Sequence, residues 1–236
     1  ACLRSGTGLI TCHIPKCGYD IMQTSLPEAM VMTDFNSSFN TKLEDDPAKY
    51  EAIGIGPGIG TASETKMMLR DILGNCKKSL VLDADALNII ASQKDLLRFV
   101  PAGSILTPHP KEFERMFGET ENEFERIELA LQKAIELNLV IVVKGHHTLI
   151  AAANGKEYFN STGSAGMATA GSGDTLTGIL TGLLAQGYVS VDAAILGVFI
   201  HGLAGDIAAK KISMEALIAG DIIDCLPEAF LNLPSL

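Results

Sequence analysis

Short apolar segments without polar alternation recur along the chain, and they constrain its fold more than any other feature. The clearest runs from Leu139 to Val143, and similar short segments run from Ala52 to Ile55, from Ser79 to Leu82 and from Ser104 to Leu106. Strands of this kind are buried on both faces, as in a parallel sheet that helices cover. A segment with helical spacing of apolar residues, Ser63 to Leu73, follows the first of them. The sequence therefore predicts an α/β fold with a mostly parallel central sheet and helices on both faces.

The remaining segments complete this outline. A strand is expected at Leu9 to Ile14 and a weaker one at Glu28 to Met32. Two further strands, Thr148 to Ala153 and Lys156 to Asn160, flank Asn154-Gly155, which is a strong hairpin signal. From Gly173 onward the pattern is mostly helical. The chain of 236 residues shows no repeat or linker, so one domain over residues 1–236 is the economical interpretation.

Composition and charge exclude some classes of function. The net charge of −10 speaks against a broad nucleic-acid-binding surface, so any phosphate must be bound by a local device such as backbone amides at the start of a helix. The longest apolar run, Ala193 to Ile200, is far shorter than the roughly 20 residues of a membrane span. No signal peptide is visible. We expect a cytoplasmic protein that binds neither nucleic acid nor membrane.

Cysteine usage agrees with that compartment. The chain has an odd number of cysteines and no CxxC pair. We expect reduced thiols. The five residues are Cys2, Cys12, Cys17, Cys76 and Cys225.

The strongest local motif runs from Ala170 to Asp174 and precedes a helix with a leucine-rich face. Ser172 or Asp174 could cap that helix, and the glycines allow an anion to approach the free amides closely. Asp174 could also take a proton from a substrate hydroxyl during phosphoryl transfer. An ordinary helix cap with closely packed glycines is the alternative. Nearby, Gly178 and Gly182 indicate tight helix packing.

Several polar residues and glycines follow directly after the predicted strands. In open α/β sheets, ligands bind just outside the carboxyl ends of the strands, so these positions should share one rim. Each also has a plain structural explanation: a tight turn for the glycines, helix capping for the aspartates, and a packed or exposed loop for the histidine. They are Gly56, Gly58, Gly60, Asp83, Asp85, His109 and Lys144.

Other known signatures do not fit. The sequence has no Walker A loop, and the glycines from Gly56 to Gly60 do not have the spacing of a dinucleotide-binding fingerprint. Because His146 and His147 are adjacent, we expect their side chains to diverge, and we predict no metal site there. His201 lies in an apolar helix, which favours a core histidine with satisfied hydrogen bonds.

Five motifs taken in order make the chain recognisable. They begin at Gly56, Leu82, Thr107, Val143 and Met167, and read GPGIG, LDADALN, TPHPKEF, VKGHHT and MATAGSGDTLTG. Together they resemble the ADP/ATP-dependent NAD(P)H-hydrate dehydratase family of the ribokinase-like superfamily. The resemblance covers nearly the whole chain and implies a ribokinase-like three-layer sandwich. It also implies a lyase of metabolite repair, which phosphorylates the ring hydroxyl of hydrated NADH or NADPH and eliminates phosphate to restore the cofactor.

The resemblance assigns expected roles to particular residues. Asp174 matches the family's substrate-contacting aspartate and is the expected catalytic base. His109 and one or more of Gly56, Gly58 and Gly60 match hydrate-binding positions, and Asp85 joins this substrate-binding set from its place at the rim. ADP or ATP is the expected nucleotide. Mg²⁺ is expected with it and would be held largely by the nucleotide, because the sequence shows no dedicated protein cage for the ion. The expected nucleotide-binding residues are Lys144, Gly145, His146, His147, Thr148, Gly171, Ser172 and Gly173.

The chain also departs from the family pattern. It opens at Ala1, and we expect it to lack the family's first strand and glycine-rich loop. Because these elements contact the substrate in the family, their loss would put activity in doubt. The segment Gly163-Ser164-Ala165-Gly166 stands where many relatives have Gly-Asn-Pro-Gly, a change that a loop working through its backbone should tolerate. Many bacterial relatives are fused to a hydrate epimerase, and relatives form homo-oligomers, so an epimerase partner and a homo-oligomer, a tetramer for instance, are expected.

Two other functions remain open. A vitamin-type kinase of the same superfamily would share the Gly-Ser-Gly-Asp helix start and would leave a stable phosphorylated alcohol. A non-catalytic nucleotide-binding module would bind ADP even with Asp174 replaced by Asn, and would turn over neither a hydrate nor an alcohol.

Overall fold

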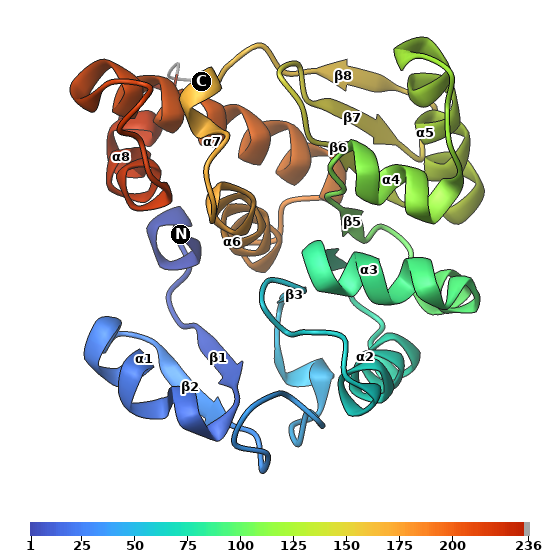
Figure 1. Cartoon of the computed structure of the whole chain (residues 1–236), viewed down its shortest axis with the longest axis vertical. Helices are drawn as coiled ribbons and strands as arrows, with labels where there is room; N and C mark the ends of the chain where they lie inside the picture. The colour runs from blue at the N-terminus through green and yellow to red at the C-terminus, as the bar shows by residue number, and fades with distance from the viewer. Residues whose placement is uncertain (234–236) are drawn as a thin grey trace.

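A computed structural model describes residues 1–233 and places a six-stranded sheet at the centre of the molecule (Figure 1). The strands lie side by side in the order in which they occur along the chain. They are β3 (Ile53–Ile55), β4 (Leu80–Leu82), β5 (Ile105–Leu106), β6 (Val140–Val143), β7 (Leu149–Ala152) and β8 (Glu157–Phe159). The strands expected from the apolar runs are confirmed, and their ends differ from the expected ones by one or two residues.

The sheet is mixed, with the parallel part first. Strands β3 to β6 run parallel, whereas β6, β7 and β8 pair antiparallel. The hairpin of β7 and β8 turns at Asn154-Gly155, where Gly155 has a φ of 79°, a value that glycine adopts at no steric cost. The predicted hairpin is therefore confirmed, and the carboxyl ends of β3 to β6 meet at one edge of the sheet.

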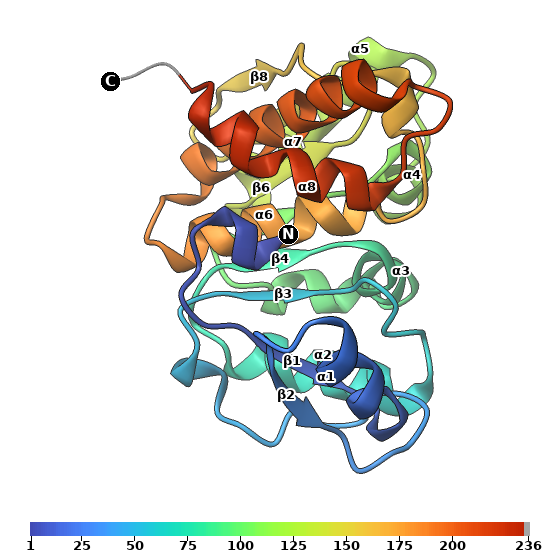
Figure 2. The same ribbon diagram turned by 90° about the vertical axis from the view of Figure 1, so that its left-hand side faces the viewer.

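Helices cover both faces of the sheet, which makes three layers (Figures 1 and 2). One layer contains α2 (Ser63–Asn75), α3 (Ala84–Ser92), α4 (Pro110–Phe117) and α5 (Glu123–Leu137). The other contains α6 (Ser172–Ala185), α7 (Ser190–Ile212) and α8 (Ala219–Leu231). Short 3-10 helices occur at η1 (Cys2–Ser5), η2 (Lys16–Gly18), η3 (Pro47–Lys49), η4 (Lys94–Phe99) and η5 (Ala165–Met167).

Strand β4 shows why the parallel strands β3 to β6 carry no polar residue. Val81 packs into the cluster formed with α6, α7 and α8, while Leu80 and Leu82 pack into the cluster formed with α2 and α3. All three side chains are fully buried. Successive side chains of a strand point to opposite faces, so a strand between two helical layers is apolar at every position.

The N-terminal residues pack on α6. Helix η1 ends at Ser5, is followed by Gly6 with a φ of 88°, and lies against α6. A Cβ at Gly178 would lie 2.9 Å from Cβ of Ala1, and one at Gly182 would lie 3.0 Å from Cβ of Ser5. The prediction that Gly178 and Gly182 mark tight packing is confirmed, and the partner is η1.

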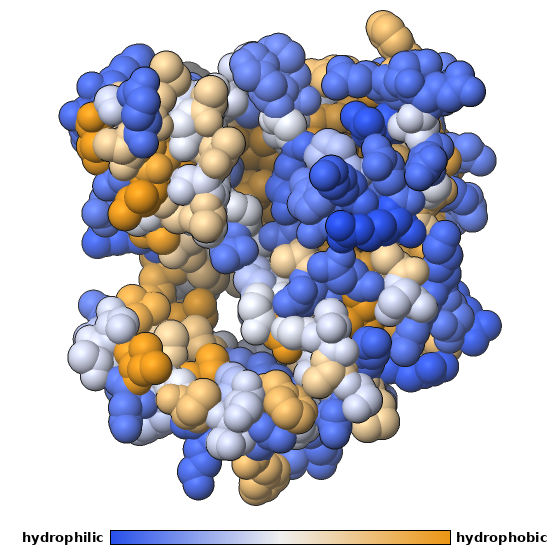
Figure 3. Space-filling model, viewed as in Figure 1, coloured by the Kyte–Doolittle hydropathy of each residue, from blue (hydrophilic) through white to orange (hydrophobic). Residues whose placement is uncertain are grey.

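The next segment forms a small separate sheet. Strands β1 (Thr11–Ile14) and β2 (Met30–Thr33) pair parallel with each other, and α1 (Tyr19–Ser25) connects them. Both strands were expected, but they pair outside the six-stranded sheet. Large apolar side chains stay exposed here, among them Leu9 and Ile21, and Figure 3 shows apolar surface over this part of the molecule.

Helix α7 is longer than the apolar run Ala193 to Ile200 that the sequence analysis considered. It spans 23 residues and, by length and composition alone, is the one helix within residues 1–233 able to cross a membrane. Half of its most apolar window is buried in the fold, against α6, α8, β6 and β7. Such burial is typical of a core helix.

Candidate active site

The rim of the parallel strands is organised around a buried aspartate. Asp83 follows β4 and is 1% exposed, and its Oδ1 lies 2.7 Å from Nζ of Lys144, which follows β6. Its Oδ2 accepts a hydrogen bond from Oγ1 of Thr177 on α6 at 2.8 Å. This carboxylate therefore ties two strand ends to the first turns of α6, and it connects residues far apart in sequence.

The two aspartates of the β4 end face different partners. Asp83 occupies the N-cap position of α3 but makes no capping hydrogen bond, so the capping alternative is wrong for its side chain. Ala84 has a φ of 46°, an uncommon conformation for a residue with a Cβ, and this bend separates the two carboxylates. Oδ2 of Asp85 accepts a hydrogen bond from the N–H of Gly60 at 2.9 Å. Asp85 thus joins the glycine turn at the rim, as expected.

The glycine turn after β3 needs its glycines. Gly56 has a φ of 139°, and a Cβ there would lie only 1.8 Å from the carbonyl oxygen of Asp83. Gly58 and Gly60 have φ values of 67° and 72°, and the space beside both is open. Positive φ and close backbone approach both favour glycine. The turn therefore lies directly against the β4 end and leaves its outer side free.

His109 caps a helix, a role that the sequence analysis did not identify. Its Nδ1 accepts hydrogen bonds from the N–H groups of Lys111 and Glu112, and Oε2 of Glu112 accepts one from the N–H of His109. This reciprocal capping box fixes the ring at the start of α4. Because Nδ1 accepts, the neutral ring carries its proton on Nε2, an atom of the half-exposed ring that lies 3.5 Å from Oε1 of Glu112.

Glu112 was missed by the sequence analysis. It is 6% exposed at the side chain, and its Oε2 lies 3.9 Å from Nζ of Lys144. Lys144 therefore faces two carboxylates, Glu112 and Asp83, from two different strand ends. A glutamate three residues after the cap position is a recognised capping-box signal, and it could have identified both His109 and Glu112.

Helix α6 begins differently from what we expected. Gly171, with a φ of 84°, is its N-cap residue, and no side chain caps the helix. The expectation that Ser172 or Asp174 would cap it is wrong, because Oγ of Ser172 lies 3.3 Å from Nε2 of His201 instead. Within residues 1–233, no hydrogen-bond acceptor takes the N–H of Gly173 or of Asp174. These free amides, at the positive end of the helix dipole, are available to donate hydrogen bonds to an anion.

Asp174 stands at this helix start and is exposed. The pKa of its carboxyl is raised above the usual value, first by partial desolvation and then by the charge of Asp83, while Lys144 opposes the rise. Gly173 brings the helix close to the buried pair, since a Cβ there would lie 3.4 Å from Nζ of Lys144. A carboxylate with a raised pKa beside free amides can accept a proton next to a bound phosphate.

The loop after β6 is exposed at Gly145, His146 and His147. Oγ1 of Thr148 closes the loop by donating to the carbonyl oxygen of Gly145 at 3.1 Å. The two histidine rings contact each other edge to face with centroids 4.4 Å apart, so the expectation that they diverge is wrong. The side-chain alternation of a strand does not extend into this turn, where the chain has left β6.

The structure thus brings most of the predicted site residues to one rim. Asp83, Lys144 and the α6 start are linked by direct contacts, Gly56 lies against Asp83, and Gly60 is bonded to Asp85. Thr177, which the sequence analysis missed, completes the tie to α6. Nothing in its local sequence marks it, because its partner lies 94 positions earlier in the chain.

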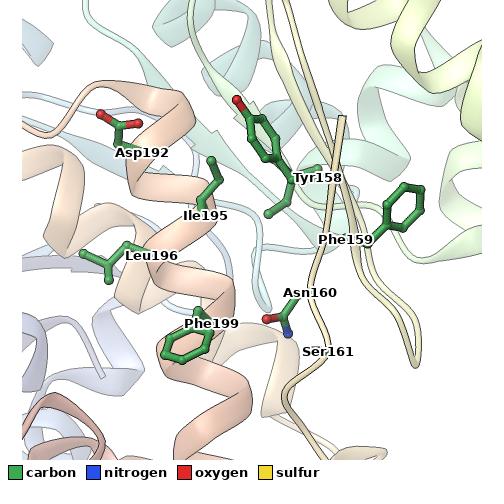
Figure 4. A pocket seen from close by; sticks show the side chains of 9 residues that line it. Tyr158, Phe159, Asn160, Ser161, Asp192, Ile195, Leu196 and Phe199 are labelled. Carbon is green, nitrogen blue, oxygen red and sulfur yellow. The ribbon is translucent and has the colours of Figure 1, made fainter. Parts of the chain in front are cut away.

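An apolar pocket lies away from this rim. It has a volume of about 340 Å³ and opens between α7 and β8, as Figure 4 shows, with Tyr158 and Leu196 on opposite sides. None of the rim residues described above lines it. Charged and titratable groups with free amides gather at the rim instead, and we therefore place the candidate active site there.

Comparison with known proteins agrees with the fold. The profile of the NAD(P)H-hydrate dehydratase family matches residues 1–228. A bifunctional NAD(P)H-hydrate repair enzyme of Moorella thermoacetica is 38% identical over 99% of this chain, and the match covers 46% of that enzyme. The ADP-dependent (S)-NAD(P)H-hydrate dehydratase of Bacillus subtilis is 34% identical over 97% of this chain and 80% of its own length.

A solved structure shows the same architecture. The ADP/ATP-dependent NAD(P)H-hydrate dehydratase of Bacillus subtilis, co-crystallized with ATP and Mg²⁺, superposes with a TM-score of 0.80 at 29% identity. The match covers 98% of this chain and 81% of that one. The chain spans less than half the length of several curated relatives named as bifunctional repair enzymes. With a ribokinase-like α/β fold and a family profile that matches nearly every residue, the chain belongs to the NAD(P)H-hydrate dehydratase family.

Proposed function

We propose that this chain catalyses the ADP- or ATP-dependent dehydration of hydrated NADH and NADPH. The observation that carries the proposal is the start of α6, where Asp174, with its raised pKa, stands beside amides that have no acceptor within residues 1–233. Phosphoryl transfer to a hydroxyl needs a proton acceptor and a cradle for negative phosphate oxygens in one place. This helix start supplies both.

The reaction proceeds in two steps. Asp174 takes the proton of the ring hydroxyl as the hydroxyl oxygen attacks the terminal phosphorus of the nucleotide. The bond from that phosphorus to the bridging oxygen breaks, so AMP leaves from ADP, or ADP leaves from ATP. The C–O bond of the phosphorylated ring then breaks, phosphate leaves with the electron pair, and the neighbouring ring carbon loses a proton. Water thereby leaves the ring at the expense of one phosphoanhydride bond. The N–H groups of Gly173 and Asp174 hold phosphate oxygens throughout.

The charges of the rim favour a divalent cation with the nucleotide. Asp83, Glu112 and Asp174 bring three carboxylates near the single ammonium of Lys144, so phosphates entering here need further positive charge. Carboxylates are ligands that suit Mg²⁺, but two of these already face Lys144. In the part of the chain that the structure describes, no group of three or more His, Cys, Asp or Glu residues could hold a metal. Mg²⁺ would therefore be held mainly by the nucleotide phosphates and would neutralise their charge.

The remaining rim residues divide between the two ligands. Gly58, Gly60, Asp85 and His109 would bind the hydrate, and the open space beside Gly58 and Gly60 leaves room for it. The exposed loop from Lys144 to Thr148 and the helix start from Gly171 to Gly173 would hold the nucleotide. Nε2 of His109 would donate a hydrogen bond to the hydrate, because the capping box fixes its Nδ1 as an acceptor.

Three statements about the setting of the enzyme belong to the same proposal. We propose that it works in the cytoplasm, in keeping with five unpaired cysteines. A hydrate epimerase, fused or separate, would supply the epimer that this site accepts, in keeping with the relatives named as bifunctional repair enzymes. The chain would act as a homo-oligomer, and the exposed apolar side chains around β1 and β2 offer surface for such contacts.

The experiment that tests the proposal mixes the protein with hydrated NADH or NADPH, Mg²⁺ and either ADP or ATP, and follows the near-ultraviolet absorbance of the restored dihydronicotinamide. A nucleotide-dependent rise supports the proposal and identifies the preferred nucleotide and hydrate. If absorbance stays flat while a stable phosphorylated alcohol accumulates from a small-alcohol substrate, the chain is a vitamin-type kinase. Binding of ADP without turnover of either substrate would identify a non-catalytic module.

A further inference from the structure

The loop 162–171 leads from β8 into α6, and its position decides where the free amides of Gly173 and Asp174 point. Short local hydrogen bonds shape this loop, among them those from the N–H of Met167 to the carbonyl oxygen of Ser164 and from the N–H of Ser172 to that of Thr169. These bonds do not connect the loop to the sheet or to a neighbouring helix. Something else must hold it in place against the fold.

Helix α7 makes three polar contacts with the loop and its end, and in one of them Oγ1 of Thr162 donates to the carbonyl oxygen of Phe199 at 3.0 Å. Nε2 of His201 lies 3.3 Å from Oγ of Ser172, the first residue of α6. One turn and a half further along α7, Oδ2 of Asp206 accepts a hydrogen bond from the N–H of Gly163 at 2.9 Å. The contacts of His201 and Asp206 hold opposite ends of the loop, and both side chains come from one segment of α7.

Two glycines of the same segment let the loop lie directly on the helix. A Cβ at Gly202 would lie 2.2 Å from Oγ1 of Thr162 and 2.7 Å from its backbone carbon. A Cβ at Gly205 would lie 2.1 Å from Sδ of Met167. Distances this short leave no room for a side chain on this face of α7. The segment from His201 to Asp206 therefore forms the surface on which the loop packs, with polar contacts at its two ends and glycines between them.

His201, the histidine of this packing surface, is uncharged at neutral pH. Burial lowers the pKa of His201 to about 4, with the charge of Lys144 adding to the effect and the contact with Ser172 opposing it. The group of the helix start that the ring contacts is Oγ of Ser172, a residue that is itself only 7% exposed. The effect of the ring on the site must act through Ser172.

We propose that His201 and Asp206 are positioning residues for the anion-binding start of α6. They fix both ends of the loop 162–171 on α7, so that the amides of Gly173 and Asp174 point at the transferred phosphate. This inference rests on the proposed function, since it assigns that phosphate to the site. Neither residue touches the reacting atoms, and both should act on nucleotide affinity and turnover only through the geometry of the loop.

The test compares disruptive and conservative replacements at the two positions. His201→Ala and Asp206→Leu remove the contacts, whereas Gln at 201 can still reach Oγ of Ser172 and Asn at 206 can still accept from the N–H of Gly163. We expect the disruptive variants to raise the Kd for Mg·ADP about tenfold, the size of one lost hydrogen bond of ordinary strength, and to lower kcat. The conservative variants should stay within about threefold of the wild type.

Gly197→Ala is the matched control. Gly197 also lies on α7, but a Cβ there would meet Cδ2 of Leu180 at 2.6 Å, in the middle of α6 and away from the loop. This variant should lower Tm while the Kd for Mg·ADP stays near that of the wild type. A loss of affinity that merely followed a loss of stability would appear in it as well, and would overturn the positioning role.

Hydrogen exchange gives a readout that does not depend on the proposed function. Amides of residues 162–175 should exchange faster in His201→Ala and Asp206→Leu than in the wild type, and at the wild-type rate in Gly197→Ala and in the conservative variants. Unchanged exchange in folded disruptive variants overturns the inference, whatever the enzyme turns over. A wild-type protein that dehydrates no hydrate, but whose loop responds in this way, would refute the proposed function and leave the positioning of the helix start supported.

Discussion

Replacing Asp83 with Asn tests the centre of the site, because this replacement keeps the size of the side chain and removes only its charge. Asn can still accept the hydrogen bond from Thr177, but Lys144 loses its partner at 2.7 Å and keeps only Glu112 at 3.9 Å. Breaking a fully buried ion pair costs about 3–5 kcal/mol. Since the Lys144 side chain is 22% exposed and Glu112 remains, we expect a smaller loss, about 2–3 kcal/mol. For a domain of this size that loss lowers Tm by roughly 4–12 °C.

The same replacement should shift the pH dependence of catalysis. The charge of Asp83 helps to raise the pKa of Asp174, and Lys144 lowers it. Removing the charge of Asp83 and freeing Lys144 both favour the carboxylate form of Asp174, so its pKa falls. A base with a lower pKa stays deprotonated to lower pH, and the acid limb of the kcat/KM profile should therefore move to lower pH.

The assay combines thermal unfolding with initial rates of hydrate dehydration measured across the acid range. Asp71→Asn serves as the control. Asp71 is exposed on α2, so this replacement removes the same charge far from the rim. The control should match the wild type in both measurements. An Asp83→Asn protein with wild-type Tm and an unmoved acid limb would refute the reasoning that Asp83 holds the rim together.

Three further predictions follow from individual contacts. Lys144→Ala leaves the rim carboxylates uncompensated, so the Kd for Mg·ADP should rise about tenfold by titration calorimetry, and an unchanged Kd would remove Lys144 from nucleotide binding. Gly56→Ala places a Cβ 1.8 Å from a backbone oxygen at a φ of 139° and should lower the free energy of unfolding in urea by about 2–4 kcal/mol; a loss below about 0.5 kcal/mol would contradict the close approach. The pKa of His201, lowered to about 4 in the folded chain, means that the unfolded chain binds the proton first, so stability falls as pH drops from about 6.5 to about 4. His201→Gln should flatten that fall by up to about 3 kcal/mol, and equal slopes in the two proteins would contradict the shift.

The layered fold could be predicted because its signal is local. Strand β4 is apolar at Leu80, Val81 and Leu82 since both of its faces are covered, and the Asn-Gly turn fixes the hairpin of β7 and β8. The sequence could not show that β1 and β2 pair apart from the main sheet. Strand pairing depends on which edges meet in space, and the two segments carry no signal that distinguishes them from members of the central sheet.

The site could be predicted as a set of positions but not as a set of contacts. The strand-end rule brings Asp85, His109 and Lys144 to one rim, because parallel strands end on the same side. The partners of those residues depend on side chains that meet across the fold. Asp83 and Lys144 are 61 positions apart, and His201 reaches Ser172 from another helix. The prediction of a side-chain cap for α6 was wrong for a related reason. Gly171 takes the N-cap position, and the hydroxyl of Ser172 contacts His201 instead.

The most direct test of the account measures hydrate dehydration and nucleotide binding together in Asp174→Asn. Asn cannot accept the hydroxyl proton, but the amides that bind phosphate stay in place. Turnover of hydrated NADH with Mg·ADP or Mg·ATP should therefore fall by about 10²–10⁴-fold while the Kd for the nucleotide stays within about twofold. A variant that restores dihydronicotinamide absorbance at the wild-type rate would contradict the assignment of Asp174 as the base and of the α6 start as the reacting centre.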